Sequence, residues 1–273
     1  MQPLDGSIAK FNRARNQIKA LNETIAATLN GYTYSVVIAE RDRDPSYRVL
    51  RLRTEQDALP IEWSAIVGEI AHDLRSSLDL LACQLAILNP ANSRVIEDVV
   101  EKVSFPILLY GPRSKRPESR WRRNTGGLFK RKHKTLIEGL QPYHRRNGQR
   151  LSPLWLLHEL NNADKHRFIQ IAMVSASVIS PRRLTLSRGP DVTESPMIGG
   201  IEVKQGVPFK NGAKIGRIEI NSQGNVKVDV RITAEVRFNQ GCEAVKGFHV
   251  MSVLVGASNA VNETLRLFSG EFR

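Results

Sequence analysis

The sequence has few cysteines and no long apolar run. Cys83 and Cys242 are its only cysteines, and neither lies in a CxxC spacing, which argues against a disulfide framework or a zinc site of clustered thiolates. No apolar stretch approaches the roughly 20 residues that a membrane-spanning helix needs. The first 17 residues contain no apolar stretch that could act as a secretory signal. We therefore expect a cytoplasmic protein with no membrane partner.

Several sequence motifs of known chemistry are also missing. The chain contains no GxxxxGK[ST], GxGxxG or GxSxG segment, so these phosphate-binding loops and the serine nucleophile elbow are not indicated. It has no HxxxH or HExxH pair, and no cysteine accompanies a histidine. We therefore predict no metal site and no cofactor. The alternative is a hard cation held by His158, Asp164 and Asn161.

Positive charge is abundant and concentrated in one stretch. The net charge is +13, yet residues 113–150 alone hold 13 lysines and arginines against the two acids Glu118 and Glu138. Such a segment attracts polyanions, and aromatic rings among its cations suit stacking on unpaired bases. The alternative is a solvated charged loop. The residues predicted to contact RNA or DNA are Arg120, Trp121, Arg122, Arg123, Lys130, Arg131, Lys132, Arg145 and Arg146.

Hydrophobic periodicity predicts an α+β fold, a helical bundle with a mostly antiparallel β-meander packed on it. Hydrophobic residues make up 41% of the chain and charged residues 25%, which is enough for a real core. We expect one unit over 1–273, with helical parts at about 1–30, 60–165 and 243–270, strand-rich parts at about 32–54 and 168–240, and a basic loop at 111–127. The individual helices are expected at 5–29, 61–88, 128–140, 154–164 and 243–268. The strands are expected at 34–39, 47–52, 168–179, 183–186, 201–207, 214–220 and 226–238.

The helix expected at 61–88 carries a polar stripe. His72, Arg75, Ser76 and Asp79 share one side of it, while apolar residues cover the other sides of its C-terminal half. A helix that is apolar almost all round is usually buried. Buried charges must be paired, and Arg75 and Asp79, four residues apart, can reach each other.

A second polar set lies at 157–168. Helical spacing places His158, Asn161, Asp164 and Lys165 on one face, and Glu159, Asn162 and His166 on another. Imidazoles, acids and an amine are the groups that acid–base chemistry or phosphate handling needs. The alternative is a structural network that ties the helix end to the following strand. The candidate catalytic residues are His72, Arg75, Asp79, His158, Asp164, Lys165 and His166.

Two segments carry a resemblance to known families. Residues 66–79, with Leu74-Arg75-Ser76-Ser77-Leu78-Asp79, and residues 157–167, ending Asp164-Lys165-His166-Arg167, resemble a bacterial protein family with an LRSALDHLA helix followed by LxxLNxxDKHR. That resemblance covers most of the chain and implies no activity. The family often has a histidine after the Asp of its first motif, where this chain has Leu80.

The first segment is also distantly similar to HEPN helical bundles. Many HEPN proteins are RNA-cutting toxins or defence proteins, so this similarity implies a hydrolase or nuclease. The usual HEPN signature is an arginine followed, after four to six residues, by a histidine. None of the six histidines here has an arginine at that spacing.

Three functions therefore stay open. The first is binding of RNA or DNA through residues 113–150. The second is a hydrolase, or a nuclease of HEPN-like toxin or defence type, in which the two polar sets meet. The third is a non-enzymatic assembly or regulatory protein, whose sheet and terminal helix bind a partner or form a homo-oligomer.

Overall fold

The computed structural model describes residues 2–55, 59–92, 103–111, 127–145, 148–166, 168–187, 198–204, 206–220 and 225–272. The chain divides into two compact units. We call Met1–Asn22, Ile61–Gln170 and Asn239–Arg273 the helical unit, and Glu23–Pro60 and Ile171–Phe238 the strand unit. Helices and antiparallel strands together confirm the predicted α+β class. Among the described residues, none of the helices combines the length and apolarity that crossing a membrane requires.

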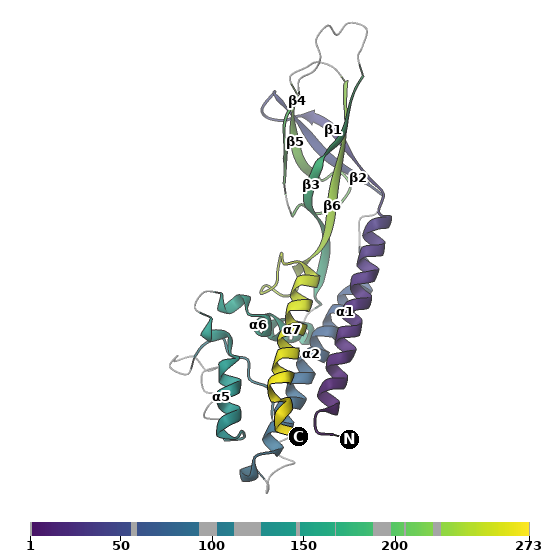
Figure 1. Cartoon of the computed structure of the whole chain (residues 1–273). Coiled ribbons are helices and arrows are strands. Elements are labelled where there is room, and N and C mark those ends of the chain that lie inside the picture. The colour runs from purple at the N-terminus through teal and green to yellow at the C-terminus, as the bar shows by residue number, and fades with distance from the viewer. Residues whose placement is uncertain are drawn as a thin grey trace. The chain divides into compact units, whose positions relative to one another are not determined.

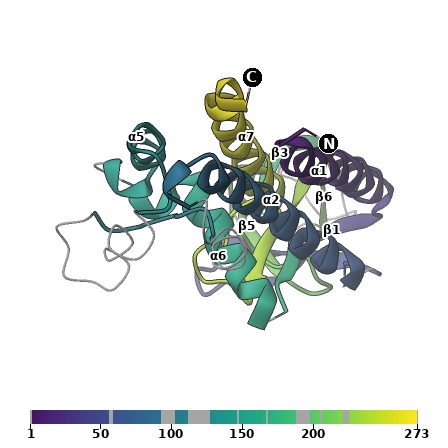
Figure 2. The same cartoon turned by 90° about the horizontal axis from the view of Figure 1, so that it is seen from below.

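The helical unit is built on three helices that pack against one another (Figures 1 and 2). These are α2 (Ile61–Ile87), α6 (Pro153–His166) and α7 (Val250–Phe268), joined by the first part of α1 (Asp5–Gly31) and by α5 (Arg131–Gly139). Short 3-10 turns lie at Pro90–Asn92, Pro142–His144, Gln149–Leu151 and Ser269–Phe272. Leucines of α2 are fully buried along its length, as the all-round apolar pattern predicts; they are Leu74, Leu78, Leu81 and Leu85.

The last helix begins later than the sequence pattern indicates. A helix was predicted from residue 243, but α7 starts at Val250. Gly247 has φ +79°, a left-handed conformation that a regular helix does not allow. His249 then acts as the N-cap, because its imidazole accepts a hydrogen bond from the Ser252 N–H. The prediction of residues 243–249 as helix is therefore wrong.

The strand unit contains two sheets. One has the order β1 (Tyr34–Arg41), β2 (Tyr47–Thr54), β5 (Lys214–Ile220), β4 (Ile198–Val203), and its neighbouring strands are antiparallel. The other pairs β3 (Gln170–Ser187) with β6 (Asn225–Gln240). The segments expected as separate strands at 168–179 and 183–186 form the single strand β3. Proline is tolerated at an edge, and both strands of a two-stranded sheet are edges, which accommodates Pro181.

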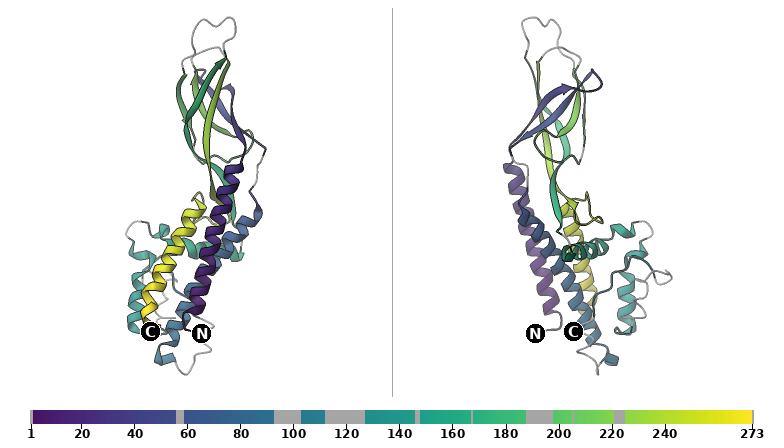
Figure 3. Two further views of the ribbon diagram at one scale, coloured as in Figure 1. Left: turned by 45° about the vertical axis from the view of Figure 1, so that its right-hand side comes forward. Right: turned by 180° about the vertical axis from the view of Figure 1, so that it is seen from behind.

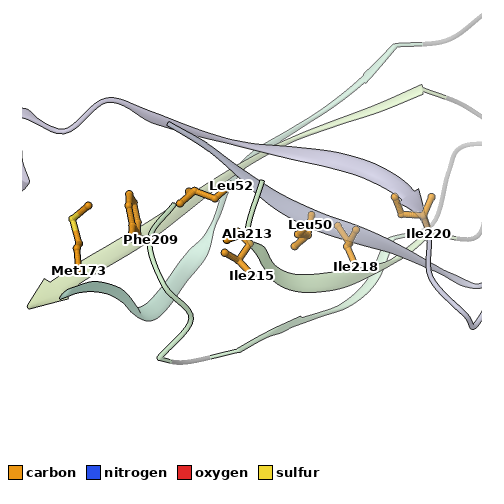
Figure 4. Packing of buried hydrophobic residues seen from close by; sticks show 8 residues of the cluster. All are labelled: Leu50, Leu52, Met173, Phe209, Ala213, Ile215, Ile218 and Ile220. Atoms are coloured by element: carbon orange, nitrogen blue, oxygen red, sulfur yellow. The ribbon is translucent and has the colours of Figure 1, made fainter. Parts of the chain in front are cut away.

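A cluster of buried apolar residues forms the core of the strand unit (Figure 4). Alternation places inward residues two apart, as at Leu50 and Leu52 of β2 and Ile218 and Ile220 of β5. The cluster consists of Leu50, Leu52, Met173, Phe209, Ala213, Ile215, Ile218 and Ile220. The Tyr34 ring meets Phe209 edge-on, with 5.4 Å between centroids. This unit is therefore held together by ordinary apolar packing.

Candidate functional site

The polar stripe of α2 is centred on an ion pair in which the arginine is buried. The Arg75 side chain is 9% exposed, and its Nη2 donates to Asp79 Oδ1 at 2.8 Å while Nε donates to Oδ2 at 3.2 Å. Asp79 also accepts the Phe105 N–H at 2.8 Å, and Arg75 Nη2 donates to the Phe105 carbonyl. The predicted pairing of Arg75 with Asp79 is confirmed. It fixes α2 to the extended segment around Phe105.

The stripe becomes more exposed away from Arg75. His72 is exposed, and its Nε2 lies 3.3 Å from the Ser76 hydroxyl. The Asp79 side chain is 33% exposed. The expectation of a buried polar stripe therefore holds for Arg75 and is wrong for His72, because α2 presents that side chain to solvent.

The polar face of α6 holds a neutral histidine. His158 is half-buried, its ring lies 5.4 Å from that of Trp155, and its Nε2 is 3.0 Å from Asn162 Nδ2. Burial lowers the pKa of His158 to about 4, helped by the positive charges of Arg75 and Lys165. An amide nitrogen can only donate, so Nε2 accepts, and the neutral ring carries its proton on Nδ1.

The polar sets of α2 and α6 meet where the two helices pack against each other. Gly68 is buried on α2, and a methyl group added there would overlap the carboxylate of Asp164. Burial raises the pKa of Asp164, while the neighbouring His72 opposes that rise. Farther along the helices, the charge of Arg75 acts on His158. The α2–α6 site, defined as His72, Arg75, Asp79, His158 and Asp164, therefore brings together residues of two separate sequence motifs.

Two other candidate residues lie at the margin of this site. Lys165 is exposed and affects His158 only through its charge. His166, the last residue of α6, is exposed and forms no hydrogen bond or ion pair to the site among the described residues. Helical spacing had already put His166 on a different face, and the structure does not bring it to the α2–α6 site.

Two donors in the site lack an acceptor. Arg75 Nη1 and His158 Nδ1 are buried, and neither has a hydrogen-bond partner among the residues that the structure describes. An unpaired buried donor costs on the order of 1–3 kcal/mol. An oxygen-bearing anion is the ligand that two such donors suit. Within the described ranges, no group of three or more His, Cys, Asp or Glu could hold a metal ion.

Sequence reasoning missed a second buried charge on α2. The Asp73 side chain is fully buried, where it accepts from Lys10 Nζ at 3.0 Å and from Arg13 Nη2 at 2.9 Å, both on α1. Burial alone would raise the pKa of Asp73, but these donors together lower it. The sequence does show that Lys10 and Arg13, at i, i+3 spacing, share one face of α1. Nothing in the sequence places them opposite Asp73.

The basic segment is described only in part. Arg120, Trp121, Arg122, Arg123 and Arg146 lie outside the described residues. On α5, Arg131 and Lys132 are exposed, and just before it Lys130 is half-buried. Lys132 and the buried His133 both bind the carboxylate of Glu271, the latter at 2.9 Å. This contact holds the end of the chain against α5.

Aromatic rings accompany the cations after α5. The Tyr143 and His144 rings lie 4.5 Å apart, and the exposed Arg145 follows them. The Tyr143 hydroxyl donates to Glu138 at 3.1 Å. The described part of the basic segment therefore combines ring faces with exposed guanidinium groups.

Comparison with known proteins gives no relative from which a role could be taken. No family model, no curated protein and no solved structure matches this chain.

Proposed function

We propose that the protein binds single-stranded nucleic acid, RNA or DNA, through residues 113–150. The observation that carries this proposal is the charge imbalance of the segment, 13 cations against two acids in a chain whose net charge is +13. Phosphate contacts by lysine and arginine supply most of the affinity of non-specific nucleic-acid binding.

The described part of the segment supports this function. Arg131 and Arg145 are exposed, and neither forms an ion pair with another described residue. Glu138, one of the two acids, already accepts the Tyr143 hydroxyl. The Tyr143 and His144 rings beside Arg145 suit a base stacked next to a phosphate contact. Unpaired bases offer ring faces that a duplex hides, so we expect a preference for single strands.

The test is fluorescence anisotropy of a labelled 20-nucleotide single strand and its duplex from 50 to 200 mM salt. The logarithm of the affinity should fall against the logarithm of the salt concentration, with a slope of about −0.7 for each phosphate contacted. Arg131→Gln with Arg145→Gln should lower the affinity and flatten the slope by about 0.7 per lost contact. Arg43→Gln, an exposed arginine outside the segment, is the matched control. An affinity that salt leaves unchanged would refute the proposal.

We infer a second function, hydrolysis of a phosphate ester at the α2–α6 site. The observation that favours it is the pair of buried donors Arg75 Nη1 and His158 Nδ1, which have no acceptor within the described part of the chain. Donors fixed before the reaction stabilise charge that develops on phosphate oxygens in the transition state. His72, exposed beside the Ser76 hydroxyl and near Asp164, is the group placed to move a proton.

Histidine variants test the second function. Hydrolysis of labelled single-stranded RNA and of bis(p-nitrophenyl) phosphate should fall at least tenfold in His72→Gln and His158→Gln, which corresponds to about 1.4 kcal/mol of lost transition-state stabilisation. His166→Gln is the matched control, since it lies on α6 outside the site. Absence of wild-type turnover, or equal rates in all three variants, would eliminate the hydrolase and leave the nucleic-acid proposal standing.

A further inference from the structure

A groove runs between α1 and α7 in the helical unit, apart from the α2–α6 site. Its volume is about 450 Å³, within the roughly 300–1,000 Å³ of small-molecule sites. Each helix contributes five residues to the lining. The first is Phe11 on α1 and Met251 on α7, and the other four follow it at the same intervals on both helices. Each stripe runs over 12 residues, about 16 Å of helix from first to last. Figure 3 places the start of α1 and the end of α7 at the same end of the helical unit, so the two stripes run antiparallel.

The floor of the groove is apolar. Phe11 and Ile18 of α1 and Met251 of α7 line it and are each less than 9% exposed, which shows that they also belong to the core. Val255 lines it as well and is 44% exposed. Side chains of this kind give an elongated apolar ligand a surface from which it can displace water.

The walls of the groove are polar and carry charge of one sign. Arg15 and Lys19 line it from α1, and three asparagines and a serine complete the lining, which includes no acidic residue. Arg15 is exposed and forms no ion pair with another described residue. An anion can pair with the Arg15 guanidinium, and the asparagine amides can add hydrogen bonds.

We propose that the α1–α7 groove binds an amphipathic organic acid of the fatty-acid type. Its chain lies along Phe11, Ile18, Met251 and Val255, and its carboxylate meets the Arg15 guanidinium. The apolar floor suits the hydrocarbon chain of such a ligand, and the positively charged wall suits its carboxylate. This site shares no residue with the basic segment or the α2–α6 site, so it is independent of both proposed functions.

The experiment is isothermal titration of decanoate into the full chain, below the concentration at which decanoate forms micelles. We expect saturable binding of one decanoate per chain. Decyltrimethylammonium has the same chain with a positive head, and acetate has the same head with no chain. Both should bind at least tenfold more weakly than decanoate.

Two variants locate the site. Arg15→Gln should weaken decanoate binding at least tenfold, while Arg266→Gln, an exposed arginine of α7 outside the groove, should leave it unchanged. Val255→Lys places a charged chain across the apolar floor at an exposed position and should abolish binding with little change in the unfolding midpoint. The proposal is overturned if decanoate does not bind, if decyltrimethylammonium binds equally well, or if Arg15→Gln and Val255→Lys bind decanoate like the wild type.

Discussion

The helical unit and the strand unit bury different kinds of side chain. The core cluster of the strand unit consists of apolar residues, and one of the unit's ion pairs, between Arg217 and Glu202, lies at the surface, with side chains 37% and 56% exposed. The helical unit encloses the carboxylate of Asp73 completely and leaves only 9% of the Arg75 side chain exposed. Burying charge is costly unless each group is paired. The helical unit is therefore where single polar substitutions should have large effects, and it also holds every candidate site.

The largest expected effect comes from leaving Asp73 without its partners. Lys10→Gln with Arg13→Gln leaves a buried carboxylate unpaired, which should cost about 3–5 kcal/mol of unfolding free energy. Urea denaturation measures it. Asp73→Asn in that background should recover much of the loss, because the amide is neutral. The control is Arg15→Gln on the same helix, an exposed arginine. A midpoint for the Lys10→Gln, Arg13→Gln variant equal to that of Arg15→Gln would show that Asp73 does not depend on Lys10 and Arg13.

Asp79→Ala should rank next, at about 3 kcal/mol, because, of the acceptors that the described residues offer Arg75, only the Phe105 carbonyl then remains. The double change Arg75→Met with Asp79→Leu should be milder than Asp79→Ala, since it leaves no unpaired charge. The free energy of unfolding is measured in urea, because the ions of guanidinium chloride would screen the charges of Arg75 and Asp79. A double variant less stable than Asp79→Ala would contradict the buried-charge explanation.

The pH dependence of the unfolding free energy should show that His158 is neutral in the folded protein. Its folded pKa of about 4 lies below the ordinary 6.5, so the unfolded chain takes up the proton first. His158 therefore contributes fully above pH 6.5, and its contribution is lost as pH falls from 6.5 to about 4. For a half-buried group, we expect a loss on the order of 2–3 kcal/mol. The wild type should lose more stability than His158→Gln over this window, and parallel curves would contradict a neutral His158.

Gly68→Ala should have a smaller effect, which depends on Asp164. The new methyl group meets the Asp164 carboxylate, so the change should cost about 1–2 kcal/mol despite the better helix propensity of alanine. In an Asp164→Ala background the same change should be neutral or stabilising by up to about 1 kcal/mol. A double-mutant cycle with no coupling between the two positions would show that α2 and α6 do not meet there.

The smallest effect is expected in the strand unit. Glu202→Gln removes the exposed carboxylate that accepts from Arg217 at 2.7 Å. Surface pairs contribute little, so thermal unfolding should shift by less than about 2 °C. Leu50→Ala, in the apolar core of the same unit, should cost about 2–5 kcal/mol. A Glu202→Gln variant as damaged as Leu50→Ala would remove the contrast between the units.

The sequence predicted those features that depend on local spacing. The burial of α2 follows from its all-round apolar pattern, and the Arg75–Asp79 pair follows from i, i+4 geometry. The ion pairs of Asp73 bridge 63 and 60 residues, and no periodicity specifies such partners. The approach of Gly68 to Asp164 likewise depends on how two helices pack.

Other parts of the candidate site could not be predicted from residue types. Among the described residues, Arg75 Nη1 and His158 Nδ1 have no acceptor, because Asp79, Phe105 and Asn162 bind other atoms of the two side chains. The α1–α7 groove forms between one stripe of residues on each helix, and neither stripe alone indicates a binding site. The start of α7 was misplaced because the turn at Gly247 interrupts a segment with helix-compatible composition.

If the proposed function is right, the helical unit binds nucleic acid through residues 113–150. The most direct measurement is hydrogen–deuterium exchange of the full chain, with and without a 20-nucleotide single strand at low salt. We predict slower exchange in peptides covering α5 and residues 141–150, and unchanged exchange in β2 and β5. Protection confined to β2 and β5, with α5 unaffected, would contradict the claim.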